Sequence, residues 1–135
     1  PAILHSTGNP HGYLILRGGV GSGPNYGPQS VHDAAAALAD RELPASLIVD
    51  CSHANSDKDP GRQAVVMSSL CEQIEQGQGA IRGVMLESHL VSGTQQVVEG
   101  QPLTYGQSIT DACLSLEETV PLLELLAAAV RRAAG

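Results

Sequence analysis

The sequence predicts an α/β fold with three strand–helix units and parallel strands. Short apolar runs alternate with segments of helical periodicity, so each strand is followed by a crossover of helix length. The core must consist of aliphatic side chains, because the chain has no Phe, no Trp and three Tyr, and such cores are typical of parallel sheets. With 135 residues, we expect one domain over 1–135.

The first strand–helix unit lies in the N-terminal third of the chain. A buried strand is predicted over 13–17, because glycines bound a run of Leu and Ile. A tightly turned or flexible loop follows over 18–28, with five glycines and two prolines. A helix is then expected over 30–39, with Ser30 as its N-cap and Asp33 as the partner in a capping-box-like pair.

The other two units follow the same order. They comprise strands over 46–50 and 80–86, helices over 61–75 and 115–134, and a long loop over 88–112. In the last helix the acidic residues stand in the first turn and Arg131 and Arg132 in the last turn, which suits the helix dipole. The sequence therefore contains three βα units in succession.

Three parallel strands make a thin sheet, and a parallel sheet needs cover on both faces. A closed (β/α)₈ barrel takes about 250 residues, and this chain has 135. We therefore expect a partial (β/α)₈ TIM barrel of about three βα units. The two edges of such a sheet would be open to pairing.

Composition excludes some classes of partner. The net charge of −7 and the single lysine, Lys58, argue against a nucleic-acid-binding protein, which needs clustered positive charge. No apolar stretch reaches the length of about 20 residues that spans a bilayer. Three cysteines without a disulfide framework favour a reducing compartment, so we expect a cytoplasmic protein.

Three potential metal ligands follow strand ends or precede a helix. His53 comes just after one strand, Glu87 directly after the next, and Asp111 shortly before the last helix. Each also has an ordinary interpretation, as a surface histidine, a strand-exit carboxylate and a turn aspartate. Ligands bind at the carboxyl edge of parallel sheets. Together, imidazole and carboxylates suit Mn²⁺, Fe²⁺, Co²⁺ or Zn²⁺, which can act as Lewis acids on a carbonyl oxygen.

Other residues near these strand ends have weaker signals. Arg17 ends the first strand beside Gly18, where it either binds a phosphate or carboxylate or secures the glycine-rich loop. Cys51 and Cys113 each stand within two residues of a proposed ligand, but no base is placed to activate them. His89 is a second imidazole near Glu87, either close to the site or on the surface.

Four longer strings connect these residues to a known family. They are Ile15-Leu16-Arg17-Gly18-Gly19, Asp50-Cys51-Ser52-His53-Ala54-Asn55-Ser56, Gly83-Val84-Met85-Leu86-Glu87-Ser88-His89-Leu90 and Tyr105-Gly106-Gln107-Ser108-Ile109-Thr110-Asp111-Ala112-Cys113. With these strings in this order, the chain resembles the type I 3-deoxy-D-arabino-heptulosonate 7-phosphate (DAHP) synthases of the larger bacterial and yeast subgroup.

The resemblance implies the first reaction of the shikimate pathway, which leads to chorismate and the aromatic amino acids. Phosphoenolpyruvate condenses with erythrose 4-phosphate in a transferase reaction on a metal-dependent (β/α)₈ barrel. Of the family's metal ligands, a Cys, a His, a Glu and an Asp, the last three correspond to His53, Glu87 and Asp111. The arginine that binds phosphoenolpyruvate corresponds to Arg17.

The resemblance also implies that residues 1–135 match only the C-terminal part of the family barrel. The cysteine ligand and most of the Lys and Arg that hold both substrates belong to the early half, which this chain does not contain. We therefore expect DAHP synthase activity to need the missing N-terminal half, in the same protein or as a separate chain. The alternative is an inactive C-terminal module that associates with copies of itself.

Overall fold

A three-stranded parallel sheet in the order β1-β2-β3 is the centre of the computed structural model, which describes residues 2–9 and 11–135. The strands are β1 (Leu14–Leu16), β2 (Leu47–Asp50) and β3 (Ile81–Met85). Leu16 is in register with Val49, which is in register with Val84. The predicted α/β class with parallel strands is confirmed, and the carboxyl ends of all three strands share one edge of the sheet.

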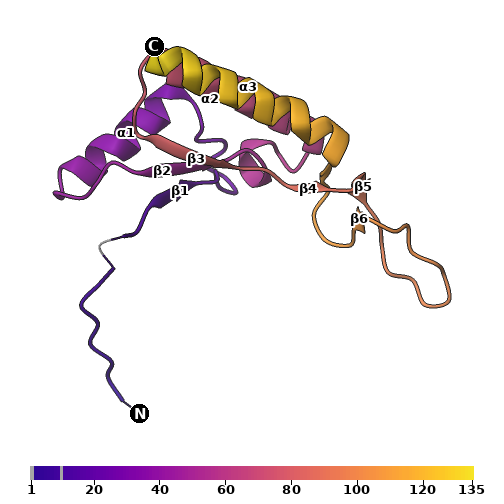
Figure 1. The fold of residues 1–135 in the computed structure, drawn as a ribbon. Coiled ribbons are helices and arrows are strands. Elements are labelled where there is room, and N and C mark those ends of the chain that lie inside the picture. The colour runs from indigo at the N-terminus through magenta and orange to yellow at the C-terminus, as the bar shows by residue number, and fades with distance from the viewer. Residues whose placement is uncertain (1, 10) are drawn as a thin grey trace.

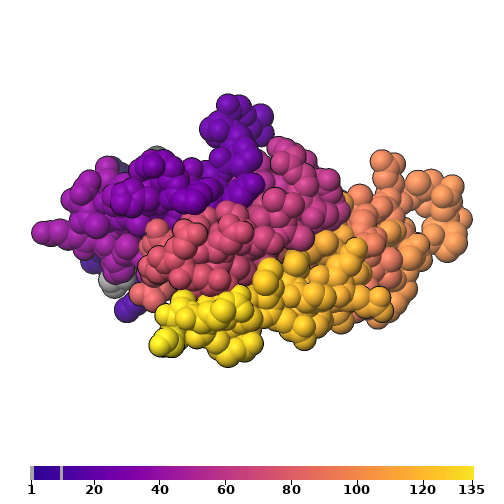
Figure 2. Space-filling model, turned by 90° about the horizontal axis from the view of Figure 1, so that it is seen from above, coloured from indigo at the N-terminus to yellow at the C-terminus, as the bar shows by residue number. Residues whose placement is uncertain are grey.

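Three helices lie on the same side of this sheet (Figure 1): α1 (Pro28–Ala39), α2 (Gln63–Glu75) and α3 (Leu116–Ala134). Seen from that side, α2 lies between α1 and α3 (Figure 2). One apolar cluster joins the helices to the sheet; its buried members are Leu16, Val31, Leu47, Val49, Cys51, Val66, Met67, Leu70, Cys71, Ala80 and Ala129. Aliphatic residues thus supply the core, as the scarcity of aromatics predicts.

The opposite face of the sheet has no helix among the described residues. Side chains on this face remain accessible: Ile15 is 50% exposed, and Arg82 is exposed as well. The chain leading into β1, residues 2–9, is exposed and extends away from the sheet in Figure 1. One sheet face is therefore packed and the other is open.

The predicted start of the first helix is wrong. The helix α1 begins at Pro28, with Gly27 as its N-cap and no side-chain cap. Proline is favoured at the first helical position because its fixed φ suits the helix and its missing N–H would have no partner there. Ser30 consequently lies inside the helix, and Asp33 accepts a hydrogen bond from Gln29 Nε2 at 2.7 Å.

The glycine-rich segment before α1 is tightly turned, one of the two interpretations that the sequence allows. Gly19 and Gly23 exchange two backbone hydrogen bonds of 3.1 and 3.0 Å, which close a small hairpin. Gly18 precedes this hairpin with a φ of +69°. The chain after β1 therefore turns back at once toward the segment that follows β2.

The predicted loop over 88–112 is partly ordered by short strands. They are β4 (Ser88–His89), β5 (Val91–Thr94) and β6 (Gln107–Ser108), and β7 (Leu114–Ser115) follows. These strands form two small parallel pairs, β4 with β7 and β5 with β6. Most of them have only two residues, too few for an alternating pattern to be recognised in the sequence. Their pairing returns the chain to the end of β3 before α3 begins.

The remaining helix boundaries agree closely with the predictions. Before α2, the 3₁₀ turn Pro60–Arg62 is capped by Asp59, whose carboxylate accepts a hydrogen bond from the Gly61 N–H at 2.9 Å. A capping box joins Ser115 and Glu118 at the start of α3. In the part of the chain that the structure describes, no helix combines the length and apolarity needed to cross a bilayer.

Candidate metal centre

His53, Glu87 and Asp111 come together at the carboxyl edge of the sheet. The Nε2 atom of His53 lies 3.8 Å from Glu87 Oε1 and 3.9 Å from Asp111 Oδ2. One donor atom from each residue lies within 4.8 Å of the others. The residues stand in the turn after β2, just after β3 and in the loop before β7. The structure therefore brings the three candidate ligands together at the strand ends.

A strained turn directs His53 toward the two carboxylates. His53 begins the 3₁₀ turn His53–Asn55 with a φ of 48°, a left-handed conformation that is uncommon outside glycine. Asn55 stabilises this turn through two hydrogen bonds. Its buried Nδ2 donates to the carbonyls of Leu16 at 3.1 Å and Asp50 at 2.7 Å. The surrounding hydrogen bonds thus maintain the unfavourable dihedral angle, a pattern typical of functional sites.

The same network includes the glycine-rich segment after β1. Asn25 donates its backbone N–H to Asn55 Oδ1 at 2.8 Å, and its own Oδ1 accepts from the Gly18 N–H at 2.7 Å. Gly18 packs directly against the histidine turn, because a Cβ there would lie 3.0 Å from two atoms of Ala54. The segments after β1 and β2 therefore form one connected unit.

Asp50, the last residue of β2, engages the other ring nitrogen of His53. Its Oδ2 lies 2.7 Å from His53 Nδ1, and its Oδ1 accepts the backbone N–H of Ser52 at 2.7 Å. The carboxylate is almost inaccessible, since the residue is 1% exposed. With Nδ1 engaged by Asp50, Nε2 is the nitrogen that faces Glu87 and Asp111.

Glu87 is positioned through its backbone. Gln63, the first residue of α2, donates from Nε2 to the Glu87 carbonyl at 3.1 Å and accepts the Glu87 N–H at Oε1 at 2.8 Å. Gln63 is completely buried. The Glu87 carbonyl also accepts the Leu114 N–H at 2.9 Å. These three hydrogen bonds satisfy both backbone groups of Glu87, so the residue leaves β3 in a defined direction.

Asp111 and Cys113 reach the site through the pairing of the small strands. Cys113 exchanges two backbone hydrogen bonds with Gly93, of 2.8 and 3.1 Å. Its thiol is 4.0 Å from Glu87 Oε2 and 3.5 Å from the carbonyl of Asp111. The pKa of the Cys113 thiol is raised above its ordinary value, mainly because the thiol is buried. Asp111 itself is the most open of the three donors, its side chain being 49% exposed.

The other residues singled out in the sequence are not part of this cluster. Arg17 is exposed and directly follows β1, whose last residue, Leu16, is in register with Val49. Arg62 forms an ion pair with Asp57. His89 is exposed, and its Nδ1 accepts the Leu90 N–H at 2.7 Å.

Cys51 and Cys71 belong to the core. Both are buried and free, and burial raises the pKa of Cys51 to about 12, with Asp50 as the second cause. The pKa of Cys71, on α2, is also raised by burial, with Glu75 as the next cause. A thiol with a high pKa in apolar surroundings is unreactive at neutral pH. Both cysteines therefore have packing roles.

The electrostatics of the cluster favour a cation. Three carboxylates, from Asp50, Glu87 and Asp111, surround the single imidazole of His53. Among the described residues, no Lys or Arg forms an ion pair with any of these carboxylates. One imidazole with carboxylates is a donor set for borderline divalent ions. The residues present therefore fit a divalent metal that polarises a bound oxygen atom.

Comparison with known proteins identifies the family. The model of the DAHP synthetase I family matches residues 2–124. The chain belongs to the DAHP synthetase I family. It is 49% identical over 128 residues to the Trp-sensitive phospho-2-dehydro-3-deoxyheptonate aldolase of Salmonella typhimurium, covering 95% of this chain and 36% of that protein. It is 46% identical over 134 residues to the Phe-sensitive enzyme of Escherichia coli K12, covering 99% of this chain and 38% of the relative.

Solved structures agree with this assignment. The phospho-2-dehydro-3-deoxyheptonate aldolase of Francisella tularensis superposes with a TM-score of 0.91 at 47% identity, over 99% of this chain and 38% of that chain. The present chain thus spans little more than a third of the length of these DAHP synthetase I relatives. The family resemblance predicted from the four sequence strings is confirmed.

Sequence reasoning missed three residues that support the site of this family member. Asp50 is a carboxylate at the end of an otherwise apolar strand, and this position alone could have identified it. Asn55 and Gln63 are polar residues that become completely buried through long-range hydrogen bonds. Nothing in their local sequence indicates burial, because their partners come from β1 and from the segment after β3.

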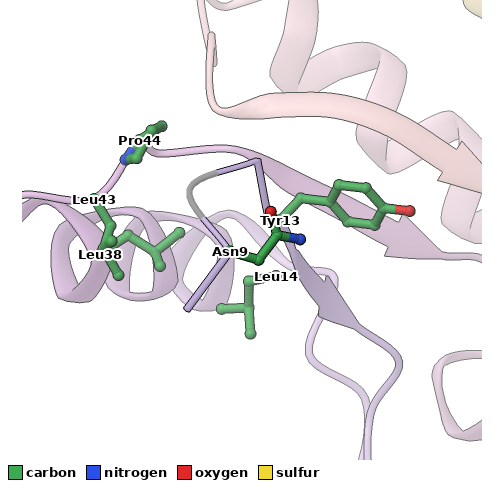
Figure 3. A pocket seen from close by; sticks show the side chains of 7 residues that line it. Asn9, Tyr13, Leu14, Leu38, Leu43 and Pro44 are labelled. Carbon is green, nitrogen blue, oxygen red and sulfur yellow. The ribbon is translucent and has the colours of Figure 1, made fainter. Parts of the chain in front are cut away.

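A separate apolar pocket lies at the opposite end of the sheet (Figure 3). Its lining comes from the segment before β1, from β1 itself and from the end of α1 with the loop after it: Asn9, Gly12, Tyr13, Leu14, Leu38, Leu43 and Pro44. These residues precede or begin the strands, whereas the His53 cluster follows the strands. The pocket therefore lies near the amino-terminal ends of β1 and β2 and shares no lining residue with the His53 cluster.

Proposed function

We propose that residues 1–135 form the C-terminal part of a (β/α)₈ barrel DAHP synthase. The complete barrel would condense phosphoenolpyruvate with erythrose 4-phosphate in the shikimate pathway. The observation that carries the proposal is the convergence of His53, Glu87 and Asp111 in a member of the DAHP synthetase I family. The open sheet edge and the uncovered sheet face are where further βα units would add.

In this proposal His53 Nε2 and the carboxylates of Glu87 and Asp111 hold a divalent metal, Mn²⁺, Fe²⁺, Co²⁺ or Zn²⁺. The metal supplies Lewis-acid polarisation of the sugar aldehyde. Asn55 and Gln63 keep the donor-bearing backbone rigid, so that little reorganisation accompanies binding. The exposed side of Asp111 leaves room for substrate to approach.

Arg17 is the proposed binding residue for phosphoenolpyruvate. A guanidinium forms paired hydrogen bonds with phosphate or carboxylate, and Arg17 carries no ion pair among the described residues. It follows β1 at the edge where the metal donors gather. The substrate anion would therefore be held next to the polarised aldehyde.

This chain alone has too little positive charge for the whole reaction. It contains seven Lys and Arg residues against fourteen Asp and Glu residues, and two phosphorylated substrates must be held together. Activity is therefore expected from a protein that also contains the missing barrel half. A cytoplasmic location belongs to the same proposal, supported by three free, buried thiols.

Metal binding by the chain tests the site directly. Mn²⁺ titration followed by electron paramagnetic resonance should show one bound ion in the unaltered protein and a loss of at least ten-fold in affinity in His53→Ala. His89→Ala is the matched control, because His89 is a nearby exposed imidazole outside the cluster. Equal affinity in His53→Ala and the unaltered protein would disprove this metal site.

Activity is tested by phosphoenolpyruvate consumption with erythrose 4-phosphate and Mn²⁺. The chain alone should show no turnover, and addition of the N-terminal two thirds of a related DAHP synthase should restore it. His53→Ala in the reconstituted protein should abolish turnover again. Steady turnover by the isolated chain would contradict the requirement for a second half.

The alternative is an inactive module that associates with copies of itself. The observation that favours it is the open β1 edge with its apolar pocket and exposed Tyr13 and Leu14. An unpaired strand edge is a template for pairing with a second chain. Reconstituted activity would support the enzyme, whereas a stable homodimer that resists reconstitution would support the module.

A further inference from the structure

We infer that Asp50 is a positioning residue that selects the His53 tautomer with its proton on Nδ1, leaving the Nε2 lone pair free for a metal. The inference rests on the proposed metal site but concerns a residue outside the donor set. Among the described residues, Asp50 is the one buried carboxylate that touches a donor of the cluster. Asp50 contacts Nδ1, whereas the other ring nitrogen, Nε2, faces Glu87 and Asp111.

The hydrogen bonds around Asp50 allow one position for the proton on the His53 ring. Its Oδ1 is taken by the Ser52 N–H at 2.7 Å, a donor that cannot become an acceptor. The remaining oxygen, Oδ2, lies 2.7 Å from His53 Nδ1. An ionised carboxylate only accepts hydrogen bonds, so Nδ1 must be the protonated nitrogen. At 1% exposure, no solvent competes for this contact.

The geometry at the other nitrogen completes the argument. A neutral imidazole with its proton on Nδ1 has an unprotonated Nε2, and this atom faces carboxylate oxygens at 3.8 and 3.9 Å. Those distances exceed a hydrogen bond, so neither carboxylate holds a proton on Nε2. Partners of this kind on the far side of a ligating histidine fix its tautomer and raise its basicity.

Asp50→Asn separates this role from a merely structural one. The Asn side chain has the same size, and the Ser52 N–H requires its amide oxygen at the Oδ1 position. The amide NH₂ then faces His53 and donates to Nδ1. The proton of the imidazole must move to Nε2, so the variant keeps both hydrogen bonds but reverses the tautomer. Nε2 would no longer offer a lone pair.

The experiment is nitrogen-15 NMR of histidine-labelled, metal-free protein, with Mn²⁺ titration on the same samples. The unaltered protein should show His53 protonated on Nδ1, and Asp50→Asn should show it protonated on Nε2. Mn²⁺ affinity should fall about 10- to 100-fold in Asp50→Asn. Asp57→Asn is the matched control, because Asp57 lies in the same loop, pairs with Arg62 and does not touch His53; its affinity should be unchanged.

The outcomes separate this inference from the proposed function. A neutral His53 with its proton on Nε2 and none on Nδ1 in the unaltered protein overturns the role of Asp50, and this result does not require the variant to fold or metal to bind. Unchanged Mn²⁺ affinity in folded Asp50→Asn also overturns it. Equal binding by His53→Ala and the unaltered protein would instead remove the metal site, while the NMR result would still decide the tautomer.

Discussion

At the scale of single residues, the site depends on a few buried polar groups that do not themselves bind a ligand. Asn55 connects β1 to the histidine turn, and Gln63 holds the backbone of Glu87. Each side chain forms hydrogen bonds with backbone groups at the strand ends, where the regular ladder of the sheet stops. Because a buried polar group without a partner costs about 1–3 kcal/mol, these residues contribute to both stability and geometry.

Gln63→Ala should reduce stability and metal binding together. It removes two hydrogen bonds and leaves the Glu87 N–H without a partner, whereas the Glu87 carbonyl keeps the hydrogen bond from the Leu114 N–H. We expect the free energy of unfolding to fall by about 2 kcal/mol, measured by urea denaturation, and Mn²⁺ affinity to fall with it. Gln76→Ala, at the exposed C-terminal end of the same helix, should change neither quantity.

Gly18→Ala should destabilise the histidine turn. The residue has a φ of +69°, and a Cβ would approach Ala54 and the Gly23 carbonyl to 3.0 Å. Gly21→Ala is the matched control, since its φ is +90° and a Cβ added there would have nothing within 4 Å. Both variants incur backbone strain of about 1 kcal/mol, but only Gly18→Ala adds a steric clash. Equal unfolding free energies for the two would contradict close packing at Gly18.

At the scale of elements, the helices begin where side chains or proline satisfy the free N–H groups. In α3, Ser115 Oγ accepts the Glu118 N–H at 3.2 Å, and Glu118 Oε2 accepts the Ser115 N–H at 2.7 Å. This capping box starts the longest helix directly after β7, close to Asp111 and Cys113. The capping box thus fixes the C-terminal boundary of the segment that carries Asp111.

Ser115→Ala should lower the free energy of unfolding by about 1 kcal/mol, as is usual for the loss of an N-cap. The neighbouring exposed Glu117→Gln, which leaves the capping box intact, serves as the control. Thermal unfolding followed by circular dichroism measures both. If the two variants melted at the same temperature, the capping box would contribute no stability.

The capping box also predicts an acid dependence of stability. The hydrogen bonds from Ser115 hold the pKa of Glu118 below its ordinary value of 4.5, first the backbone bond and then the side-chain bond. A lowered folded pKa means stability that is present above the ordinary pKa and lost as pH falls through the folded pKa. Stability should therefore fall below pH 4.5, and Glu118→Gln should weaken that dependence, as measured by urea denaturation from pH 6 down into the acid range.

At the scale of the whole molecule, the two faces of the sheet differ in how well they are covered. Helices cover one face of the sheet, while the other face and the β1 edge expose apolar side chains such as Ile15, which is 50% exposed. Parallel sheets normally have both faces covered. The open face and the β1 edge thus leave apolar surface that no helix of the described residues covers.

Ile15→Lys should reduce self-association of the isolated chain. Light scattering should show a dimer or larger species for the unaltered protein and a shift toward monomer for the variant, because a charge on the open face opposes burial. Val65→Lys is the control, since Val65 is similarly exposed but lies on α2 on the helix side. A monomer in the unaltered protein would contradict self-association.

The order of β1 to β3 and the three helices followed from the sequence because aliphatic runs and helical periodicity are local signals. The three candidate metal ligands could be proposed for the same reason, since each stands shortly after a strand or shortly before a helix. The four strings identified the DAHP synthetase I family, which the comparisons confirmed. The start of α1 was wrong because Ser30 resembles a cap, whereas Pro28 determines the boundary.

Only the tertiary structure decided which residues support the donors. Asp50, Asn55 and Gln63 acquire their roles through contacts with chain segments distant in sequence or folded back by a turn. The pairing of β4 with β7 likewise places Asp111 beside Glu87 across a loop without a recognisable pattern. The sequence alone determined which chemistry-bearing residues the strand ends present. Their distances and hydrogen-bond partners depend on packing, which no local pattern encodes.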